Sequence, residues 1–219
     1  NEIWDQIIES AHASAEPGLL FWDNVLKYTP AEAYAEDGFH TISTNPCSEI
    51  TLSAYDSCRL LLLNLTSFVT SPFTKKASFD YKLFREKTIQ AQRLMDDLID
   101  LELECIDKII SKIEADPEPI ETRVVELDLW NRIKKAAVNG RRTGLGVTGL
   151  GDTLAMLGLQ YGSKNSIKKT DSIYKELALA SYYSSSVLAK ERGSFPVYSA
   201  DREQSHNFIQ RIFKADPRL

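Results

Sequence analysis

The stretch between Asp80 and Pro117 constrains the fold most, because its pattern fits one long amphipathic helix and no strand. Large aliphatic side chains recur along it at helical period, with Lys, Asp and Glu between them. Asp80 is a suitable N-cap, and the sequence Asp116-Pro117-Glu118-Pro119 cannot continue a helix. The positions that keep the period are Leu83, Ile89, Leu94, Leu98, Leu101, Ile106, Ile109 and Ile113.

The rest of the chain alternates further helical segments with short apolar runs. A second amphipathic helix is expected to bury Val125, Leu129, Trp130, Ile133 and Ala137 and to close at Asn139-Gly140. Other helices are expected at 3–11, 149–157 and 173–192. Buried strands are expected at 19–22 and at 60–65, continuing to 69, and an extended segment at 143–148. Residues 27–46 indicate loop, and the tail from Tyr198 is polar and weakly patterned. Long helices between short apolar runs favour an α/β layer or barrel.

Composition excludes several classes of protein. The chain has 219 residues, 43% of them hydrophobic and 26% charged, with a net charge of -5. No basic block predicts nucleic-acid binding, and no apolar run approaches the roughly 18 residues of a membrane span. The chain starts at Asn1 and not Met, so we expect a fragment or a processed chain.

Cysteine and histidine usage indicates a cytoplasmic protein without a structural metal. Cys47, Cys58 and Cys105 are the only cysteines and follow no secretory signal, which argues against a disulfide framework. The three histidines (His12, His40 and His206) do not have the spacing of a metal site.

The segment Asn45-Pro46-Cys47-Ser48-Glu49 is the densest candidate for chemistry. In an extended backbone, Asn45, Cys47 and Glu49 would share one face. The amide can orient a hydroxyl, the carboxylate can take its proton, and the thiol can do redox or nucleophilic work. On spacing alone, however, a loop with a buried structural cysteine and a surface glutamate is the commoner arrangement.

The other cysteines carry less information. Arg59 would lower the pKa of the Cys58 thiol if the guanidinium lay close to it, but a core cysteine at the start of a strand fits equally. Cys105 lies among acidic residues of the long helix and is expected to be a packing residue or a bystander. Asp96 and Asp97 are adjacent, so they point in different directions on a helix and do not form a carboxylate pair.

The segment Gly144–Gly149 matches the pattern G-x-G-x-x-G of dinucleotide-binding loops. That loop should follow an apolar strand, whereas here a polar helix ending in Arg141-Arg142 precedes it. Close packing of a strand against its neighbours is the better interpretation, and a nicotinamide-dependent enzyme remains a weaker hypothesis. Arg141 and Arg142 would suit a phosphate, although carboxylate partners are commoner.

Several segments, in order, resemble the large (catalytic) subunit of ribonucleotide reductases. The finger-loop region is matched by Thr44-Asn45-Pro46-Cys47-Ser48-Glu49-Ile50, by Asp56-Ser57-Cys58-Arg59-Leu60 and by Asn64-Leu65. The stretch from Gly140 to Asp152 resembles a second family segment, as do Pro17–Phe21 and Ala189–Gly193. The resemblance covers roughly residues 1 to 200. The motif sequences around Cys47 and Cys58 are closer to those of the adenosylcobalamin-dependent branch.

The resemblance implies a fold and a set of roles. It implies part of a ten-stranded α/β barrel, with residues 1–219 as a single partial domain and the finger loop near 44–50 at its centre. Cys47 would carry the thiyl radical that takes the 3′ hydrogen of the ribose, and Glu49 would take the 3′-hydroxyl proton. Asn45 would hydrogen-bond the sugar, and Cys58 would be one of two cysteines that reduce the substrate.

The resemblance also implies partners. These are a ribonucleotide substrate, a thioredoxin-like reductant, a second copy in a dimer, and a radical source, either adenosylcobalamin or a partner subunit. The family's second reducing cysteine, phosphate loop, C-terminal cysteines and effector loops have no match here, so we expect activity only with the remaining segments of the subunit. The family has smaller residues where this chain has Leu61-Leu62-Leu63. The three leucines would crowd the strand beside the substrate or mark a different partner surface. The competing hypothesis is a non-catalytic assembly or regulatory module that keeps the reductase fold.

Overall fold

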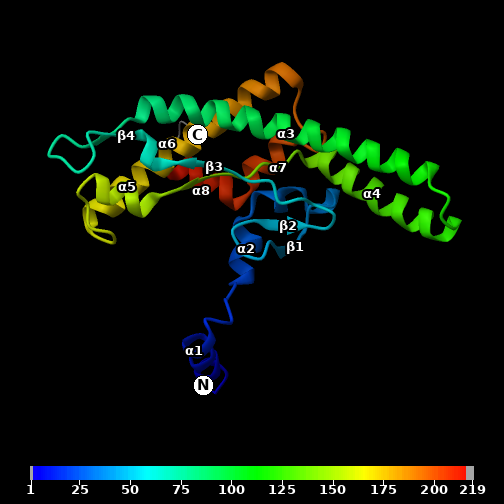
Figure 1. Ribbon diagram of the computed structural model, residues 1–219, viewed down its shortest axis with the longest axis horizontal. Helices are drawn as coiled ribbons and strands as arrows, with labels where there is room; N and C mark the ends of the chain where they lie inside the picture. The colour runs from blue at the N-terminus through cyan, green and yellow to red at the C-terminus, as the bar shows by residue number, and fades with distance from the viewer. Residues whose placement is uncertain (1, 216–219) are drawn as a thin grey trace.

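Three long helices dominate the fold, seen in a computed structural model that describes residues 2–215. They are α3 (Tyr81–Ala115), α4 (Ile120–Gly140) and α6 (Lys164–Arg192). Figure 1 shows α3 running across the molecule, with α4 folded back along its C-terminal part and α6 crossing behind its N-terminal half. The predicted long helix is confirmed, and the Asp80 carboxylate caps it by accepting a hydrogen bond from the Leu83 amide at 2.9 Å.

The face that α3 buries follows the predicted period only in part: Ile106 and Ile113 are buried. Leu94, Leu98 and Leu101 are exposed, while Phe84, Met95 and Ile99 are fully buried. The same correction applies to α4, where Ala137 is buried but Val125 and Leu129 are exposed. A helix with apolar residues on two neighbouring stripes has no preference of its own between them. The helices that pack against it decide which stripe is covered.

The two central strands lie side by side in a parallel pair. Strand β3 (Leu61–Asn64) pairs with β6 (Leu145–Thr148), so that Leu61 faces Leu145 and Asn64 faces Thr148. Both extended segments were predicted, and α3 and α4 form the crossover between them, as a parallel pair requires. Leu62 is exposed on β3, whereas Leu63 packs against the core, so the leucine run is split between two faces.

The main core lies where β3 meets the start of α3. After β3 come the 3-10 helix η2 (Leu65–Phe68) and strand β4 (Val69–Thr70), which pairs antiparallel with β5 (Ser78–Phe79). Helix α5 (Leu150–Met156) follows β6 and packs on η2. The buried cluster comprises Leu65, Phe68, Phe79, Phe84 and Ile173.

A separate hairpin carries the candidate chemistry. Strands β1 (Thr41–Thr44) and β2 (Thr51–Ser53) pair antiparallel, with an irregularity between Thr41 and Ser43. The 3-10 helix η1 (Pro30–Asp37) precedes them, so the prediction of loop over 27–46 is wrong. A second buried cluster of Ala31, Tyr34 and Phe39, with Phe195 and Val197 against it, supports this part.

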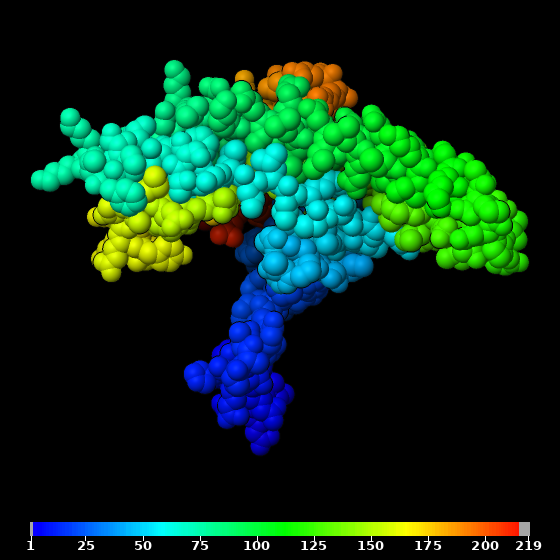
Figure 2. All heavy atoms as spheres, in the orientation of Figure 1, coloured from blue at the N-terminus to red at the C-terminus, as the bar shows by residue number. Residues whose placement is uncertain are grey.

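The described residues begin and end in helices. Helix α1 (Glu2–Ser14) confirms the first predicted helix but buries no residue, and it stands away from the body (Figures 1 and 2). The strand predicted at 19–22 is wrong, because Leu19, Leu20 and Phe21 are exposed and α2 (Trp22–Tyr28) begins there. The tail forms α7 (Ala200–Ser205) and the amphipathic α8 (Asn207–Ala215), which contacts α2.

The fold is helix-rich α/β, as predicted. Residues 2–215 contain three separate two-stranded sheets and no closed barrel. In the same residues, no helix combines the length and apolar character needed to cross a membrane. The ten-stranded barrel therefore stays an expectation that the resemblance implies.

Candidate active site

A tight turn at the end of the β1–β2 hairpin displays Cys47. The Asn45 amide donates to the Ile50 carbonyl at 3.1 Å, and the Ser48 amide donates to the Asn45 carbonyl at 3.0 Å. The Asn45 side chain closes the turn, because its Oδ1 accepts a hydrogen bond from the Ile50 amide at 3.0 Å. Asn45 is buried while Cys47 and Glu49 are exposed, so the turn is held from inside and carries its reactive groups outside.

This geometry corrects two expectations. The backbone from Pro46 to Ile50 is a turn and bend, so the extended alternation that would place Asn45, Cys47 and Glu49 on one face is wrong. The alternative of a buried structural cysteine is also wrong, because Cys47 is exposed. Asn45 uses Oδ1 and not Nδ2 for the turn. Its role toward a substrate sugar stays a prediction.

Cys58 lies on the irregular segment that leads into β3. It is exposed and free, which excludes the alternative of a core cysteine at the start of a strand. The neighbouring guanidinium of Arg59 is buried and directed to Glu102 of α3, where its Nε donates to the carboxylate. Cys105 is exposed as well, so it does not pack in the core.

Four charged side chains form a network behind the Cys58 segment. Arg142 pairs with Asp56 through Nη1 and donates from Nη2 to the Thr51 carbonyl of β2 at 2.8 Å. Arg59 donates from Nη1 to the Arg142 carbonyl at 3.2 Å, and Asp56 Oδ1 lies 3.9 Å from the same Nη1. Burial is nearly complete at the centre, where the side chains of Asp56 and Arg59 are 2% and 4% exposed. This network, named here the Asp56–Arg142 network, consists of Asp56, Arg59, Glu102 and Arg142.

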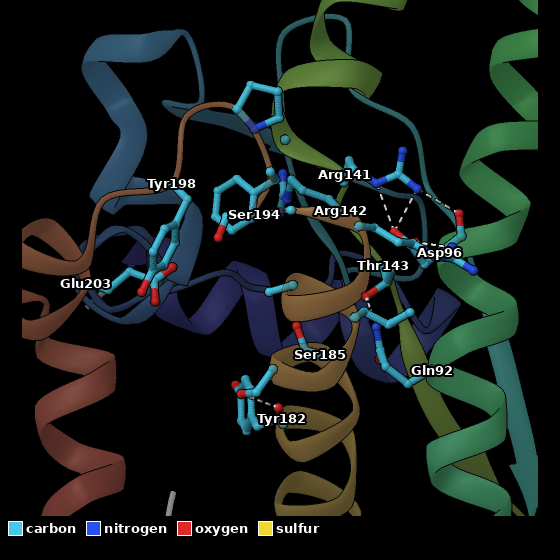
Figure 3. A pocket seen from close by; sticks show the side chains of 18 of the residues that line it. Gln92, Asp96, Arg141, Arg142, Thr143, Tyr182, Ser185, Ser194, Tyr198 and Glu203 are labelled. Carbon is cyan, nitrogen blue, oxygen red and sulfur yellow. Dashed lines mark hydrogen bonds and ion pairs between the residues drawn. The ribbon is translucent and has the colours of Figure 1, made fainter.

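Arg141 belongs to a second charged group on the other side of the same loop. Its guanidinium contacts Asp96 (Figure 3) and Asp100, each at 2.8 Å. Arg192 of α6 pairs with Asp96 and Asp97. Burial alone would lower the pKa of Arg141, but hydrogen bonds to the two aspartates outweigh it and raise that pKa. Carboxylate partners for both Arg141 and Arg142 are thus confirmed.

The glycines of 144–149 serve close packing, as predicted. A Cβ at Gly144 would lie 2.3 Å from the Arg59 carbonyl oxygen, and one at Gly149 would lie 2.8 Å from Asn64 Oδ1. Gly149 also has a φ of 75°, in the left-handed region. Gly144 and Gly146 lie beside and within the strand, not in a loop after it, which does not fit a dinucleotide site.

Two cavities lie near these networks, and neither is lined by Cys47 or Cys58. The larger, of about 1050 Å³, lies between α3, α6 and α8 (Figure 3). Its lining includes Arg141, Asp96, Asp100 and Arg192. The smaller, of about 500 Å³, lies between α3 and α4 beside Tyr55, Cys105 and Trp130. Among residues 2–215, no group of His, Cys, Asp or Glu has the arrangement of a metal site.

Neither cavity has features that identify it as a site for adenosylcobalamin, the cofactor that the resemblance implies. The smaller is the size of an ordinary small-molecule site, and the cofactor is much larger than such ligands. The arginines that line the larger, Arg141, Arg142 and Arg192, are already paired with aspartates. We therefore assign no described residue to this cofactor.

Sequence reasoning missed the Asp56–Arg142 network. Asp56, Arg59 and Arg142 stand in the motifs, but nothing predicted that they contact one another, and Glu102 carried no signal at all. Asp56 and Arg142 are 86 residues apart, so no local spacing rule connects them. The one signal in the sequence was that Arg59 and Arg142 have few acidic neighbours nearby in the chain, which indicates ion-pair partners elsewhere.

Comparison with known proteins places these residues in a family. The family model for the ribonucleotide reductase barrel domain matches residues 1–216. The vitamin B12-dependent ribonucleoside-diphosphate reductase of Thermoplasma acidophilum is 34% identical over 90% of this chain and 22% of its own length. The enzyme of the same name from Mycobacterium tuberculosis is 29% identical, over 92% of this chain and 24% of its own length.

A third relative extends the comparison to another kind of reductase subunit. The ribonucleoside-diphosphate reductase subunit alpha of Chlamydia pneumoniae is 24% identical over 91% of this chain and 16% of its own length. The chain spans about a quarter or less of the length of these curated relatives. Since the family model covers nearly the whole sequence, the chain belongs to the ribonucleotide reductase family, within its barrel domain.

Proposed function

We propose that this chain supplies the thiyl-radical hairpin of a ribonucleotide reductase catalytic subunit. The observation that carries the proposal is the turn at the end of the β1–β2 hairpin. There a free, exposed Cys47 stands two residues from an exposed Glu49, on a turn locked by Asn45. A second free, exposed thiol, Cys58, follows on the segment after β2.

The proposed chemistry divides the reduction among these side chains. A radical on the Cys47 sulfur takes the 3′ hydrogen of the bound ribonucleotide and later returns it. Glu49 takes the 3′-hydroxyl proton, which eases loss of the 2′-hydroxyl as water. The two reducing electrons come from a pair of thiols, one of them Cys58, which ends as a disulfide. Asn45 orients the sugar hydroxyl from the base of the turn.

The same proposal requires partners. The second reducing thiol and the groups that hold the substrate phosphates would come from the remaining segments of the catalytic subunit. A thioredoxin-like protein would reduce the disulfide again. When bound, adenosylcobalamin would supply the radical, as the names of the vitamin B12-dependent relatives suggest. A partner subunit is the alternative source.

The test is a pair of cysteine variants in the complete reductase. Cys47→Ser should abolish deoxyribonucleotide formation, because a serine hydroxyl does not supply a radical of matched bond strength. Cys105→Ser is the matched control and should retain activity, because Cys105 is an exposed thiol on α3 and lines the cavity at the α4 contact. Retained activity in Cys47→Ser would remove this thiol from the mechanism and favour the non-catalytic module.

A second measurement concerns the chain alone. The 219-residue chain, supplied with ribonucleotide, reductant and adenosylcobalamin, should show no turnover. Turnover by the chain alone would contradict the dependence on further segments, while leaving the role of Cys47 open to the first test.

A further inference from the structure

The Asp56–Arg142 network connects the two segments that carry the candidate thiols. Cys47 lies on the turn of the β1–β2 hairpin, and the Thr51 carbonyl, next to that turn, accepts a hydrogen bond from Arg142 Nη2 at 2.8 Å. Cys58 lies two residues after Asp56, whose carboxylate pairs with Nη1 of the same guanidinium. One planar side chain, Arg142, therefore contacts both segments at once.

The network also holds the Cys58 segment from its other side. The Arg59 side chain is 4% exposed and contacts Glu102 on α3 as well as the Arg142 carbonyl. The Arg59 carbonyl is in turn packed against Gly144, where no Cβ could fit. Asp56 further accepts a hydrogen bond from the Ser57 amide at 2.8 Å, which fixes the backbone immediately before Cys58.

Burial of Asp56 makes the Asp56–Arg142 ion pair hard to replace. Asp56 is 2% exposed in its side chain and Arg142 is 25% exposed, so water does not readily replace either partner. Removing one partner of such a pair leaves an uncompensated charge, and replacing Arg by Lys loses the ability to bridge two acceptors in one plane. The chain could secure a surface loop with far less charge, so a four-membered charged network with Asp56 and Arg59 buried at its centre needs an explanation.

We propose that Arg142 and Asp56 are positioning residues that set the place of Cys58 relative to the Cys47 hairpin. This inference rests on the proposed function for its purpose, because the two thiols must address one substrate in turn. Its geometric content is independent of catalysis: with the ion pair intact, the two cysteines keep one mutual distance, and without it they do not.

Spin labels measure that distance directly. In the full 219-residue chain, Cys105→Ser leaves Cys47 and Cys58 as the only thiols, and both are exposed and available for labelling. Electron paramagnetic resonance should give one narrow distribution of distances between the labels. Adding Arg142→Lys should replace it with a broad one, while circular dichroism shows unchanged helix content.

Arg141→Lys is the matched control. It alters the adjacent arginine, whose partners Asp96 and Asp100 lie on α3 away from both cysteines, and it should leave the distribution narrow. If Arg142→Lys does not fold, Asp56→Asn removes the charge with almost no change in volume and carries the test. A distribution as narrow in the folded variant as in the parent chain would overturn the proposal.

The outcome for positioning is separable from the outcome for function. Were Cys47→Ser to remain active in the complete reductase, the catalytic proposal would fail, whatever the labels report. If instead the distribution stays narrow while Cys47→Ser is inactive, only the positioning proposal fails. In the complete enzyme, Arg142→Lys should lower kcat with little change in KM for the ribonucleotide, because Arg142 acts on thiol placement and not on substrate binding.

Discussion

Gly144→Ala tests how tightly the Cys58 segment is packed against the strand beside it. The added Cβ would lie 2.3 Å from the Arg59 carbonyl oxygen and 3.0 Å from Ile50 Cδ1. Carbon–oxygen contacts begin near about 3.3 Å, so the backbone at Arg59 or Gly144 must move by roughly 1 Å. The obstacle is a backbone carbonyl, and the buried ion pairs of Arg59 oppose its movement.

The cost follows from two contributions. Overpacking of a tight interior contact costs about 1–3 kcal/mol, and the same movement weakens the hydrogen bond from the Leu61 amide to the Gly144 carbonyl, worth about 1 kcal/mol. We expect a loss of about 3 kcal/mol in the free energy of unfolding. For a chain of this length that corresponds to a fall in Tm of roughly 6–12 °C.

Gly151→Ala provides the matched control. Gly151 lies in α5, its Cβ would meet nothing within 4 Å, and alanine suits a helix better than glycine by about 0.5–1 kcal/mol. Thermal unfolding followed by circular dichroism should therefore separate the two variants in opposite directions. A Gly144→Ala chain with the same Tm as the unmutated chain would refute the close contact between β6 and the Cys58 segment.

Three further changes test other parts of the structure. Phe84→Ala should cost about 3–5 kcal/mol in urea unfolding, because this ring is fully buried between other phenylalanines, and a loss below about 1 kcal/mol would be incompatible with that core. Asp80→Ala should cost about 1 kcal/mol by removing the N-cap of α3, whereas Asp80→Ser should recover most of it if the cap is the cause. Burial alone would raise the pKa of Glu32, but hydrogen bonds from Thr41 and His40 outweigh it and lower the pKa below the ordinary 4.5. The unfolded chain then binds the proton more readily, so this stability is present above pH 4.5 and is lost as the pH falls through the folded pKa. The difference in Tm between the unmutated chain and Glu32→Gln should shrink in that range, and a constant difference would exclude the linkage.

Local patterns were sufficient for the bounds of α3 and for the family motifs, whereas α6 begins at Lys164, earlier than the expected 173. The ends of α3 were predicted from Asp80 and from the prolines after Asp116. Capping and helix termination depend only on residues within a turn of the helix end. The extended segments at β3 and β6 were predicted for a similar reason. The order of motifs around Cys47 and Cys58 was enough to indicate the family.

Other features depend on partners far along the chain. The strand predicted at 19–22 failed, because its apolar run has nothing to pack against and stays exposed. The periodic stripe of α3 is buried at Ile106 and Ile113 but exposed from Leu94 to Leu101, since packing against α4 and α6 determines which face is covered. At 45–50 the extended alternation of Asn45, Cys47 and Glu49 does not form, because the Asn45 side chain hydrogen-bonds the Ile50 amide and closes a turn instead.

Sequence alone thus determined where α3 begins and ends and where the family motifs around Cys47 and Cys58 lie, because both depend on neighbours within a few residues. Only the tertiary structure decided which helical faces are buried, that both thiols are exposed, and that Arg142 joins their two segments. Asp56 and Arg142 are 86 residues apart, and a buried ion pair at that separation depends on how α3 and α4 bring β6 beside β3. No pattern of period or spacing contains that information.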